Sequence, residues 1–385
     1  MEYRKWYDKD IKTSLLGFGA MRLATIDGEI DEELGFKLFD EAYKNGVNYF
    51  DTAFPYTNRK NETFVGKALK RYPRETFYLA TKLSLFCFKT KEEVYASLDN
   101  QLKTLQTDYV DFYLMHALDK YKFNQLKEWN VLEKMLEYKK QGKIRYIGFS
   151  FHDDYNTFKE ILDYFDWDFC QIQLNYMDQD IQQGLQGYYD LRKRNIPVVI
   201  MEPVKGGKLA NFNSKVASIF KDYAPDKSLA SWALRWVGSF DGIKVILSGM
   251  NSMDQVKDNL ETFNNFAPLN NHEKELVEKV RTELKKVTKV GCTSCKYCLP
   301  CPKGVNIPGM FNIYNDYAMY QNKDWANWIY SSNKEKNATA LNCVKCGLCI
   351  TKCSQGINIP EMLSKMYEEL DFLKWLHLLK KWMSF

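Results

Sequence analysis

Apolar runs alternate with amphipathic stretches along most of the chain. Between Leu15 and Met250, eight runs rich in aliphatic and aromatic residues read LLGFGAM, VNYFDTA, TFYLATKL, YVDFYLMHAL, IRYIGFSFH, FCQIQLNYM, PVVIMEPV and KVILSGM. Such near-continuous apolar runs are typical of strands buried on both faces of a parallel sheet. Stretches with helical periodicity lie between them, among them residues 31–45, 91–106, 126–141, 182–195 and 227–239.

Eight strand-then-helix units predict a (β/α)8 TIM barrel, since they follow one another over about 250 residues without a long break. A doubly wound sheet is the alternative. It fits less well because no Gly-x-Gly-x-x-Gly turn follows the first run.

The composition changes abruptly at Gly291, since eight of the ten cysteines lie beyond residue 290. We expect a barrel domain over residues 1–285, followed by a smaller α-helical domain over residues 286–385 that carries these eight cysteines. The two remaining cysteines, Cys87 and Cys170, stand alone in apolar surroundings and are interpreted as core residues.

The eight late cysteines form two groups with close spacing. The first group is Cys292, Cys295, Cys298 and Cys301, and the second is Cys343, Cys346, Cys349 and Cys353. This spacing resembles that of bacterial ferredoxins, in which the fourth cysteine of each group binds the other 4Fe-4S cluster. The prediction is therefore two clusters, one held by Cys292, Cys295, Cys298 and Cys353 and one held by Cys343, Cys346, Cys349 and Cys301.

Four-thiolate zinc is the competing interpretation of these cysteines, but zinc sites favour two Cys-x2-Cys pairs separated by a longer loop. The groups depart from the usual pattern in two ways: the first is one residue short before Cys301, and Ser354 stands where a proline is expected.

A nearly repeated phrase follows each group. CPKGVNIPGM begins at Cys301 and CSQGINIPEM begins at Cys353. The glycine permits a tight turn and the proline suits the first turn of a helix, so each phrase predicts a turn and then a helix.

Charge and composition narrow the classes of function. The formal net charge is +5, but Lys and Arg are scattered, which gives no support to nucleic-acid binding. The first residues lack the apolar core of a signal peptide, so we expect a cytoplasmic protein. The last fifteen residues, DFLKWLHLLKKWMSF, form an amphipathic pattern. Packing on the protein itself is preferred there over docking to a membrane surface or partner.

Four polar residues follow the predicted strands where barrel active sites collect. Asp51 and Tyr56 follow the second strand, Lys82 ends the third, and His116 ends the fourth. Each alone could be structural, but together they suit proton donation. A tyrosine needs a nearby cation to release its proton near neutral pH, which Lys82 would supply and Asp51 would position. His116 would then orient a carbonyl against Tyr56.

In their order, the segments GFGAMRL, FDTAFPY, LATKL, LMHAL, IGFS and LSGMNSMDQVKDNL resemble the aldo-keto reductases over about residues 10–265. With its tail, the chain resembles the branch of that family with a C-terminal ferredoxin domain. The resemblance implies hydride transfer from a nicotinamide nucleotide to an aldehyde or ketone. It also assigns nucleotide contacts to Gly17, Met21, Ser150, Gln171, Met201, Gly206, Gly207, Ser248, Gly249, Gln255 and Asn259.

Three positions depart from the family pattern: Phe151 replaces an asparagine, Met201 replaces the tyrosine that stacks on nicotinamide, and Gln255 replaces a basic residue. The cofactor is therefore NADP or NAD, and a flavin is an alternative.

The expected activity is carbonyl reduction in the cytoplasm of an anaerobe, with Tyr56 as proton donor. The clusters could be structural, relay electrons to a flavin at the barrel, or dock a ferredoxin or another redox partner. The rival functions are an electron-transfer protein and a nucleotide sensor. Phe54, Phe86, Phe88 and Phe151 predict an aromatic substrate mouth.

Overall fold

The structure is a computed structural model that describes residues 1–7, 9–292, 296, 298–353 and 355–370. It divides into two compact units. The first unit consists of residues 1–206 and 230–274, and the second consists of residues 207–229 and 275–385.

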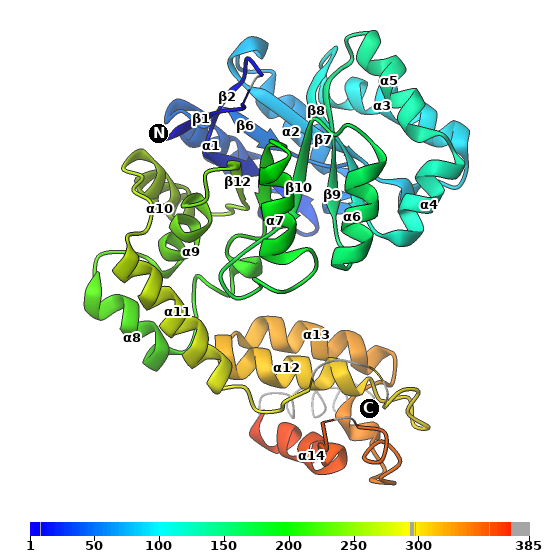
Figure 1. Ribbon diagram of the computed structural model, residues 1–385, viewed down its shortest axis with the longest axis vertical. Helices are drawn as coiled ribbons and strands as arrows, with labels where there is room; N and C mark the ends of the chain where they lie inside the picture. Colours follow the sequence, from blue (N-terminus) through cyan, green and yellow to red (C-terminus); the bar gives the residue numbers. More distant parts are fainter. Residues whose placement is uncertain (8, 293–295, 297, 354, 371–385) are drawn as a thin grey trace. The chain divides into compact units, whose positions relative to one another are not determined.

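The first unit contains a closed barrel of parallel strands (Figure 1). In sequence order the strands are β3 (Leu16–Gly19), β6 (Tyr49–Asp51), β7 (Tyr78–Leu83), β8 (Val110–Leu118), β9 (Ile144–Phe151), β10 (Phe169–Gln173), β11 (Val198–Met201) and β12 (Ile243–Ser248). Each of the eight apolar runs forms one of these strands, so the TIM barrel prediction is confirmed.

Helices follow the barrel strands along the chain. They are α1 (Glu32–Lys44), α2 (Asn61–Leu69), α3 (Lys91–Leu105), α4 (Lys120–Glu128), α5 (Val131–Lys140), α6 (Tyr155–Tyr164), α7 (Gly184–Lys193), α9 (Leu229–Gly238) and α10 (Met253–Asn264). Their starts follow ordinary capping chemistry. For example, the Asp31 and Thr90 side chains accept hydrogen bonds from the backbone N–H groups of Leu34 and Glu93.

Two short antiparallel pairs precede or interrupt the barrel: β1 (Tyr3–Lys5) with β2 (Lys12–Ser14), and β4 (Thr25–Ile26) with β5 (Glu29–Ile30). The first pair carries Trp6, which is fully buried and lies 4.7 Å from Phe112, between ring centroids, near the start of β8. The amino end of the barrel is therefore filled by side chains.

Glycine at position 17 is explained by packing inside the barrel. A Cβ atom there would lie 2.5 Å from Val245 Cγ1 and 2.9 Å from Leu247 Cδ2, inside the buried core. The Cβ direction of Gly17 therefore meets core side chains.

The helices of the second unit are α8 (Ser214–Tyr223), most of α11 (Asn271–Lys286), α12 (Ile307–Tyr320), α13 (Lys323–Glu335) and α14 (Ile359–Glu369). The last three of these helices share a core that includes Met310, Phe311, Tyr330, Leu363 and Met366.

The repeated phrase forms the predicted turn and helix start in both places. Gly304 and Gly356 have φ values of +73° and +64°, and the next helices begin after Asn306 and Asn358 with a proline in the first turn. Glycine suits this left-handed backbone because it has no Cβ.

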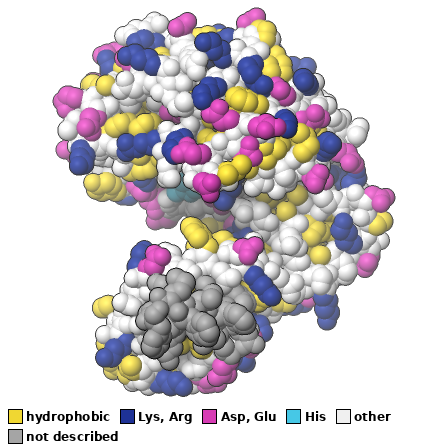
Figure 2. Space-filling model, turned by 180° about the vertical axis from the view of Figure 1, so that it is seen from behind, with side chains coloured by type: hydrophobic (Ala, Val, Ile, Leu, Met, Phe, Trp, Pro, Cys, Tyr) yellow, Lys and Arg dark blue, Asp and Glu magenta, His cyan; other side chains and the backbone are white. Residues whose placement is uncertain are grey.

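Basic and acidic side chains are interspersed on the face of the first unit seen in Figure 2. Within the described residues, no helix is both long and apolar enough to cross a membrane. The amphipathic pattern predicted for the last fifteen residues lies outside the described part of the chain.

Candidate functional site

The four predicted catalytic side chains lie at the carboxyl ends of neighbouring strands. Asp51 is the last residue of β6, Lys82 lies near the end of β7, His116 lies near the end of β8, and Tyr56 follows β6 in a short 3₁₀ turn. These three strands pair in parallel, so their ends meet at one rim of the barrel.

Lys82 and Asp51 form a buried ion pair. The Lys82 Nζ atom donates to Asp51 Oδ1 at 2.6 Å and to the carbonyl of Thr52 at 2.8 Å. Burial lowers the pKa of Lys82, but the charges of Asp51 and Tyr56 outweigh it, so the pKa is raised and the lysine stays cationic. Burial raises the pKa of Asp51, which Lys82 opposes. The other oxygen of Asp51, Oδ2, is buried without a hydrogen bond in the described structure.

Tyr56 lies beside this pair. Lys82 Nζ is 4.9 Å from the centroid of the Tyr56 ring, and the rings of Tyr56 and His116 are 5.8 Å apart at 79°. Burial raises the pKa of Tyr56, and the charge of Lys82 opposes that rise without overcoming it. The tyrosine therefore carries its proton at neutral pH, as a proton donor must.

His116 is held by a residue that the sequence did not suggest. Ser84 Oγ lies 2.6 Å from His116 Nδ1, just after β7 ends. Burial, and then the positive charge of Lys82, hold the pKa of His116 well below its ordinary value of 6.5. The imidazole is therefore neutral. When Ser84 donates to Nδ1, the ring proton lies on Nε2 and is available to a carbonyl oxygen.

A buried polar network supports the backbone of Lys82 from α2 and α3. Gln101 Nε2 donates to the Lys82 carbonyl at 3.1 Å and to Glu62 Oε1 at 2.7 Å. Thr81 Oγ1 also donates to Glu62 at 2.5 Å, and Tyr113 donates to Gln101 Oε1 at 2.7 Å. A satisfied network of this kind restricts the backbone that carries Lys82.

The residues expected at the nicotinamide carboxamide lie on adjacent strands β9, β10 and β11. Ser150 Oγ accepts from the backbone N–H of Ala117 at 2.7 Å, and Gln171 Nε2 lies 3.5 Å from Met201 Sδ. Gln171 Oε1 is buried and has no hydrogen-bond partner in the described structure. A buried acceptor without a donor fits a carboxamide N–H₂ group.

The residues expected near the phosphates and adenosine also gather at this end of the barrel. The backbone is left-handed at Gly206 and Gly207, with φ values of +64° and +94°. Asn259 Nδ2 donates to Ser248 Oγ at 2.9 Å. Gln255 Oε1 accepts from the backbone N–H of Asn251, so its side chain is tied to the start of α10.

Arg22 lies beside two of these positions and was not among the predicted contacts. A Cβ atom on Gly206 would lie 3.6 Å from Arg22 Nη2, and one on Gly249 would lie 3.0 Å from Arg22 Cγ. The neighbouring Met21 is 56% exposed. Nearby Lys205 is already neutralised by Asp178, with both Nζ–Oδ distances 2.6 Å.

The aromatic mouth was predicted in part. Phe86 is 53% exposed and its ring centroid lies 5.5 Å from that of His116, while the rings of Phe54 and Phe88 stack at 5.6 Å. Phe151 does not belong to the mouth, because it is fully buried against Phe158. Cys87 lies between Phe86 and Phe88 in the sequence and is only partly buried, so its assignment to the core was wrong. Cys170 is fully buried, as expected.

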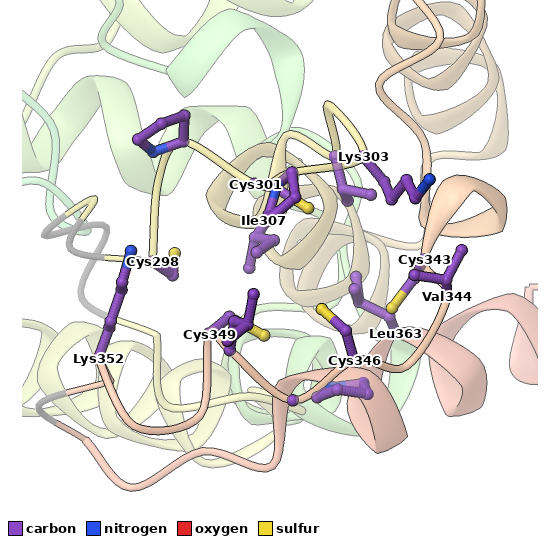
Figure 3. A pocket seen from close by; sticks show the side chains of 16 residues that line it. Cys298, Cys301, Lys303, Ile307, Cys343, Val344, Cys346, Cys349, Lys352 and Leu363 are labelled. Atoms are coloured by element: carbon purple, nitrogen blue, oxygen red, sulfur yellow. The ribbon is translucent and has the colours of Figure 1, made fainter.

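The cysteines of the second unit surround two cavities. Cys301, Cys343, Cys346 and Cys349 line the first cavity, together with Cys298, which also lines the second. Figure 3 shows the sulfur atoms of the first four turned toward the space between their two segments. Four thiols around one cavity match the ligand set of a 4Fe-4S cluster.

The second cavity is lined by Cys292, Cys298 and Cys353, together with apolar residues that include Phe311 and Ile359. The remaining predicted ligand, Cys295, lies outside the described residues, as does Ser354. The structure thus places the distal cysteine of each group beside the other group.

Comparison with known proteins agrees with both units. The aldo/keto reductase family model matches residues 15–282, and the 4Fe-4S dicluster domain model matches residues 291–357. L-galactose dehydrogenase of Arabidopsis thaliana is 26% identical over a match of 281 residues, and the match covers 68% of this chain and 87% of that protein. NADH-specific methylglyoxal reductase of Escherichia coli is 26% identical over 309 residues, covering 66% of this chain and 91% of that protein.

A solved structure shows the same barrel. The holo form of an aldo-keto reductase from Bacillus halodurans has a TM-score of 0.61 and 28% sequence identity, and the match covers 73% of this chain and 96% of that one.

Proposed function

The chain belongs to the aldo/keto reductase family and carries a 4Fe-4S dicluster domain, and from these facts we propose that it reduces an aldehyde or ketone with Tyr56 as the proton donor. The observation that carries the proposal is the buried Lys82–Asp51 pair, which lies beside Tyr56 and His116 at one end of the barrel.

A nicotinamide nucleotide, when bound, supplies the hydride. His116, neutral and positioned by Ser84, donates a hydrogen bond to the carbonyl oxygen and holds it near the Tyr56 hydroxyl. Tyr56 then transfers its proton to that oxygen as negative charge develops there. Lys82 stabilises the resulting phenolate, and Asp51 keeps Lys82 in place.

The nucleotide is NAD or NADP in this proposal. Ser150 and Gln171 would hold the carboxamide, and the left-handed backbone at Gly206 and Gly207 would lie against the pyrophosphate. Arg22 supplies positive charge at the same place. The NADH-specific relative in Escherichia coli is consistent with the neutral Gln255, which offers no charge to a 2′-phosphate.

We assign the reductase chemistry to residues 1–285 and the clusters to residues 286–385. The eight cysteines would hold two 4Fe-4S clusters, which pass one electron at a time whereas a hydride carries two. An alternative follows from that mismatch, in which a flavin at the barrel receives electrons from the clusters and from a redox partner. Mass spectrometry of small molecules released by anaerobically purified protein distinguishes these cases, since only the alternative requires flavin.

Substitution of Tyr56 by Phe tests the proposal. The variant should lose carbonyl reduction by about 10²–10⁴-fold, because a general acid contributes that much, and should keep its affinity for the nucleotide. Tyr121→Phe is a matched control, since Tyr121 is 75% exposed. Wild-type turnover in Tyr56→Phe would refute the proposed role of the tyrosine.

A further inference from the structure

An unusual backbone segment follows Tyr56. Thr57, Asn58 and Arg59 have φ values of +45°, +52° and +69°, so three consecutive residues with a Cβ are left-handed. This region is disfavoured for such residues, most of all for β-branched threonine. Strain of this kind persists only where the surroundings impose it, and it clusters at functional sites.

Hydrogen bonds from neighbouring residues impose this conformation. The Lys60 N–H donates to the Thr57 carbonyl at 3.1 Å, and Asn61 Nδ2 donates to Thr57 Oγ1 at 3.3 Å. Asn61 is fully buried, and it also accepts from Thr52 and donates to the Ala20 carbonyl. These bonds hold the backbone at Thr57, in the loop that carries both Tyr56 and Arg59.

The Arg59 guanidinium lies on the aromatic mouth. Its Cζ atom is 4.9 Å from the centroid of the Phe54 ring, which stacks in turn on Phe88. Its charge also acts on the thiol of Cys87, where burial raises the pKa and Arg59 opposes the rise. Arg59 thus lies on the rim formed by the loops after β6 and β7, the loops that carry Tyr56 and Phe86.

No carboxylate neutralises Arg59 in the part of the chain that the structure describes. Other cations nearby do have such partners, since Lys60 pairs with Glu29 and Lys122 pairs with Asp119. A guanidinium that lies over an aromatic ring can still donate its N–H groups in its own plane, which is the geometry that binds carboxylate and phosphate oxygens.

We propose that Arg59 binds an anionic group, a carboxylate or phosphate, on the carbonyl substrate, while the phenylalanines of the mouth cover the substrate's apolar part. This inference rests on the proposed carbonyl reductase function and names its substrate class as anionic aldehydes or ketones. Tyr56 and His116 act on the carbonyl, and Arg59 selects the molecule that carries it.

Matched substrates test the inference. The first pair is 4-carboxybenzaldehyde and its neutral ester, methyl 4-formylbenzoate; the second is glyceraldehyde 3-phosphate and glyceraldehyde. Steady-state kcat and KM are measured for wild type, Arg59→Met and Arg59→Lys, and binding of the product 4-carboxybenzyl alcohol is measured by calorimetry in the presence of oxidised nucleotide. Arg71→Met is the control, because Arg71 also lies over a phenyl ring, that of Phe36, but pairs with Asp40.

The wild type should prefer the anionic member of at least one pair. Arg59→Met should lower kcat/KM for that member about tenfold, chiefly through KM, since a hydrogen bond to a charged group is lost. It should leave the neutral member unchanged, Arg59→Lys should retain part of the preference, and product binding should weaken in parallel. If only the benzaldehyde pair shows this loss, Arg59 binds a carboxylate; if only the glyceraldehyde pair shows it, Arg59 binds a phosphate.

Two results would overturn the inference: an equal loss on charged and neutral members, which would assign Arg59 a structural role on Phe54, or no loss on either. A wild type that reduces no carbonyl compound with NADH or NADPH would instead refute the proposed function on which the inference rests.

Discussion

Lys82 is fully buried, and a buried ammonium group is tolerated only where an opposite charge lies next to it. Removing one partner of such a pair typically costs about 3–5 kcal/mol, because the other charge is left buried and alone. Asp51 meets that requirement at 2.6 Å. The same contact fixes the lysine beside Tyr56, so one ion pair serves both stability and the proposed proton transfer.

The pH dependence of kcat/KM follows from two shifted pKa values. His116 must be neutral to donate from Nε2 alone, and its pKa lies well below 6.5; Tyr56 must be protonated, and its pKa is raised above 10.0. The profile of the free enzyme should therefore stay flat from below pH 6.5 to about pH 10. Measured profiles of kcat/KM check this, and an acid limb centred near pH 6.5 that is absent from His116→Gln would contradict it.

The free energy of unfolding should decrease on the acid side because the pKa of His116 is lowered in the folded protein. Between its folded pKa and 6.5, His116 binds a proton in the unfolded chain but not in the folded one. The free energy of unfolding contributed by His116 is therefore fully present above pH 6.5 and decreases as the pH falls toward the folded pKa.

Site residues could be predicted from the sequence where they lie at the end of a predicted strand. Asp51, Lys82 and His116 were found because each ends an apolar run. Ser84 and Arg22 were missed because their significance comes from contacts with residues that are distant in sequence. Arg59 was missed because its significance comes from the backbone conformation of its loop and from its place over the Phe54 ring. Phe151 was misplaced because residues alternate between faces along a strand, which an all-apolar run conceals.

At the scale of elements, the strands were predictable and the short pairs were not. Runs of seven to ten residues rich in apolar side chains identify buried strands, whereas β1 and β2 have three residues each with little apolar pattern. The pairing of the distal cysteines was predicted from spacing, and in the structure Cys301 and Cys353 each line a cavity with cysteines of the other group.

The exchanged cysteines make a specific prediction about iron content. Cys301→Ser and Cys343→Ser should remove the same cluster, and Cys353→Ser and Cys292→Ser should remove the other, because each pair lines one cavity. Each single variant should retain about half of the iron and sulfide, since each cysteine is proposed to bind only one of the two clusters. Chemical iron and sulfide analysis after anaerobic purification measures this.

Double variants separate this arrangement from the sequential one. Cys301→Ser with Cys343→Ser should lose no more iron than either alone, whereas Cys301→Ser with Cys292→Ser should lose both clusters. The opposite result would mean that each group holds its own cluster, and Cys87→Ser, outside both cavities, serves as the control.

At the scale of the molecule, the two cluster-binding segments differ in charge from the rest of the chain. Residues 291–306 and 336–360 contain five lysines and no Asp or Glu, although the whole chain has 49 acidic residues. Beside the first cavity, Val344 and Leu348 are 58% and 55% exposed. Exposed apolar side chains near several side chains of like charge are typical of a surface that binds an oppositely charged partner.

The partner expected from this charge is a small acidic electron carrier, so a purified acidic ferredoxin should bind the second unit in a salt-dependent manner. Lys345→Glu combined with Lys352→Glu should weaken binding at low salt by tenfold or more, since like charges then oppose docking. Calorimetric titration at two ionic strengths measures this, and iron content verifies that the clusters persist. Lys44→Glu with Lys140→Glu, exposed lysines of the barrel unit, is the matched control. Equal affinities of these two double variants, or an affinity that salt leaves unchanged, would place the carrier elsewhere.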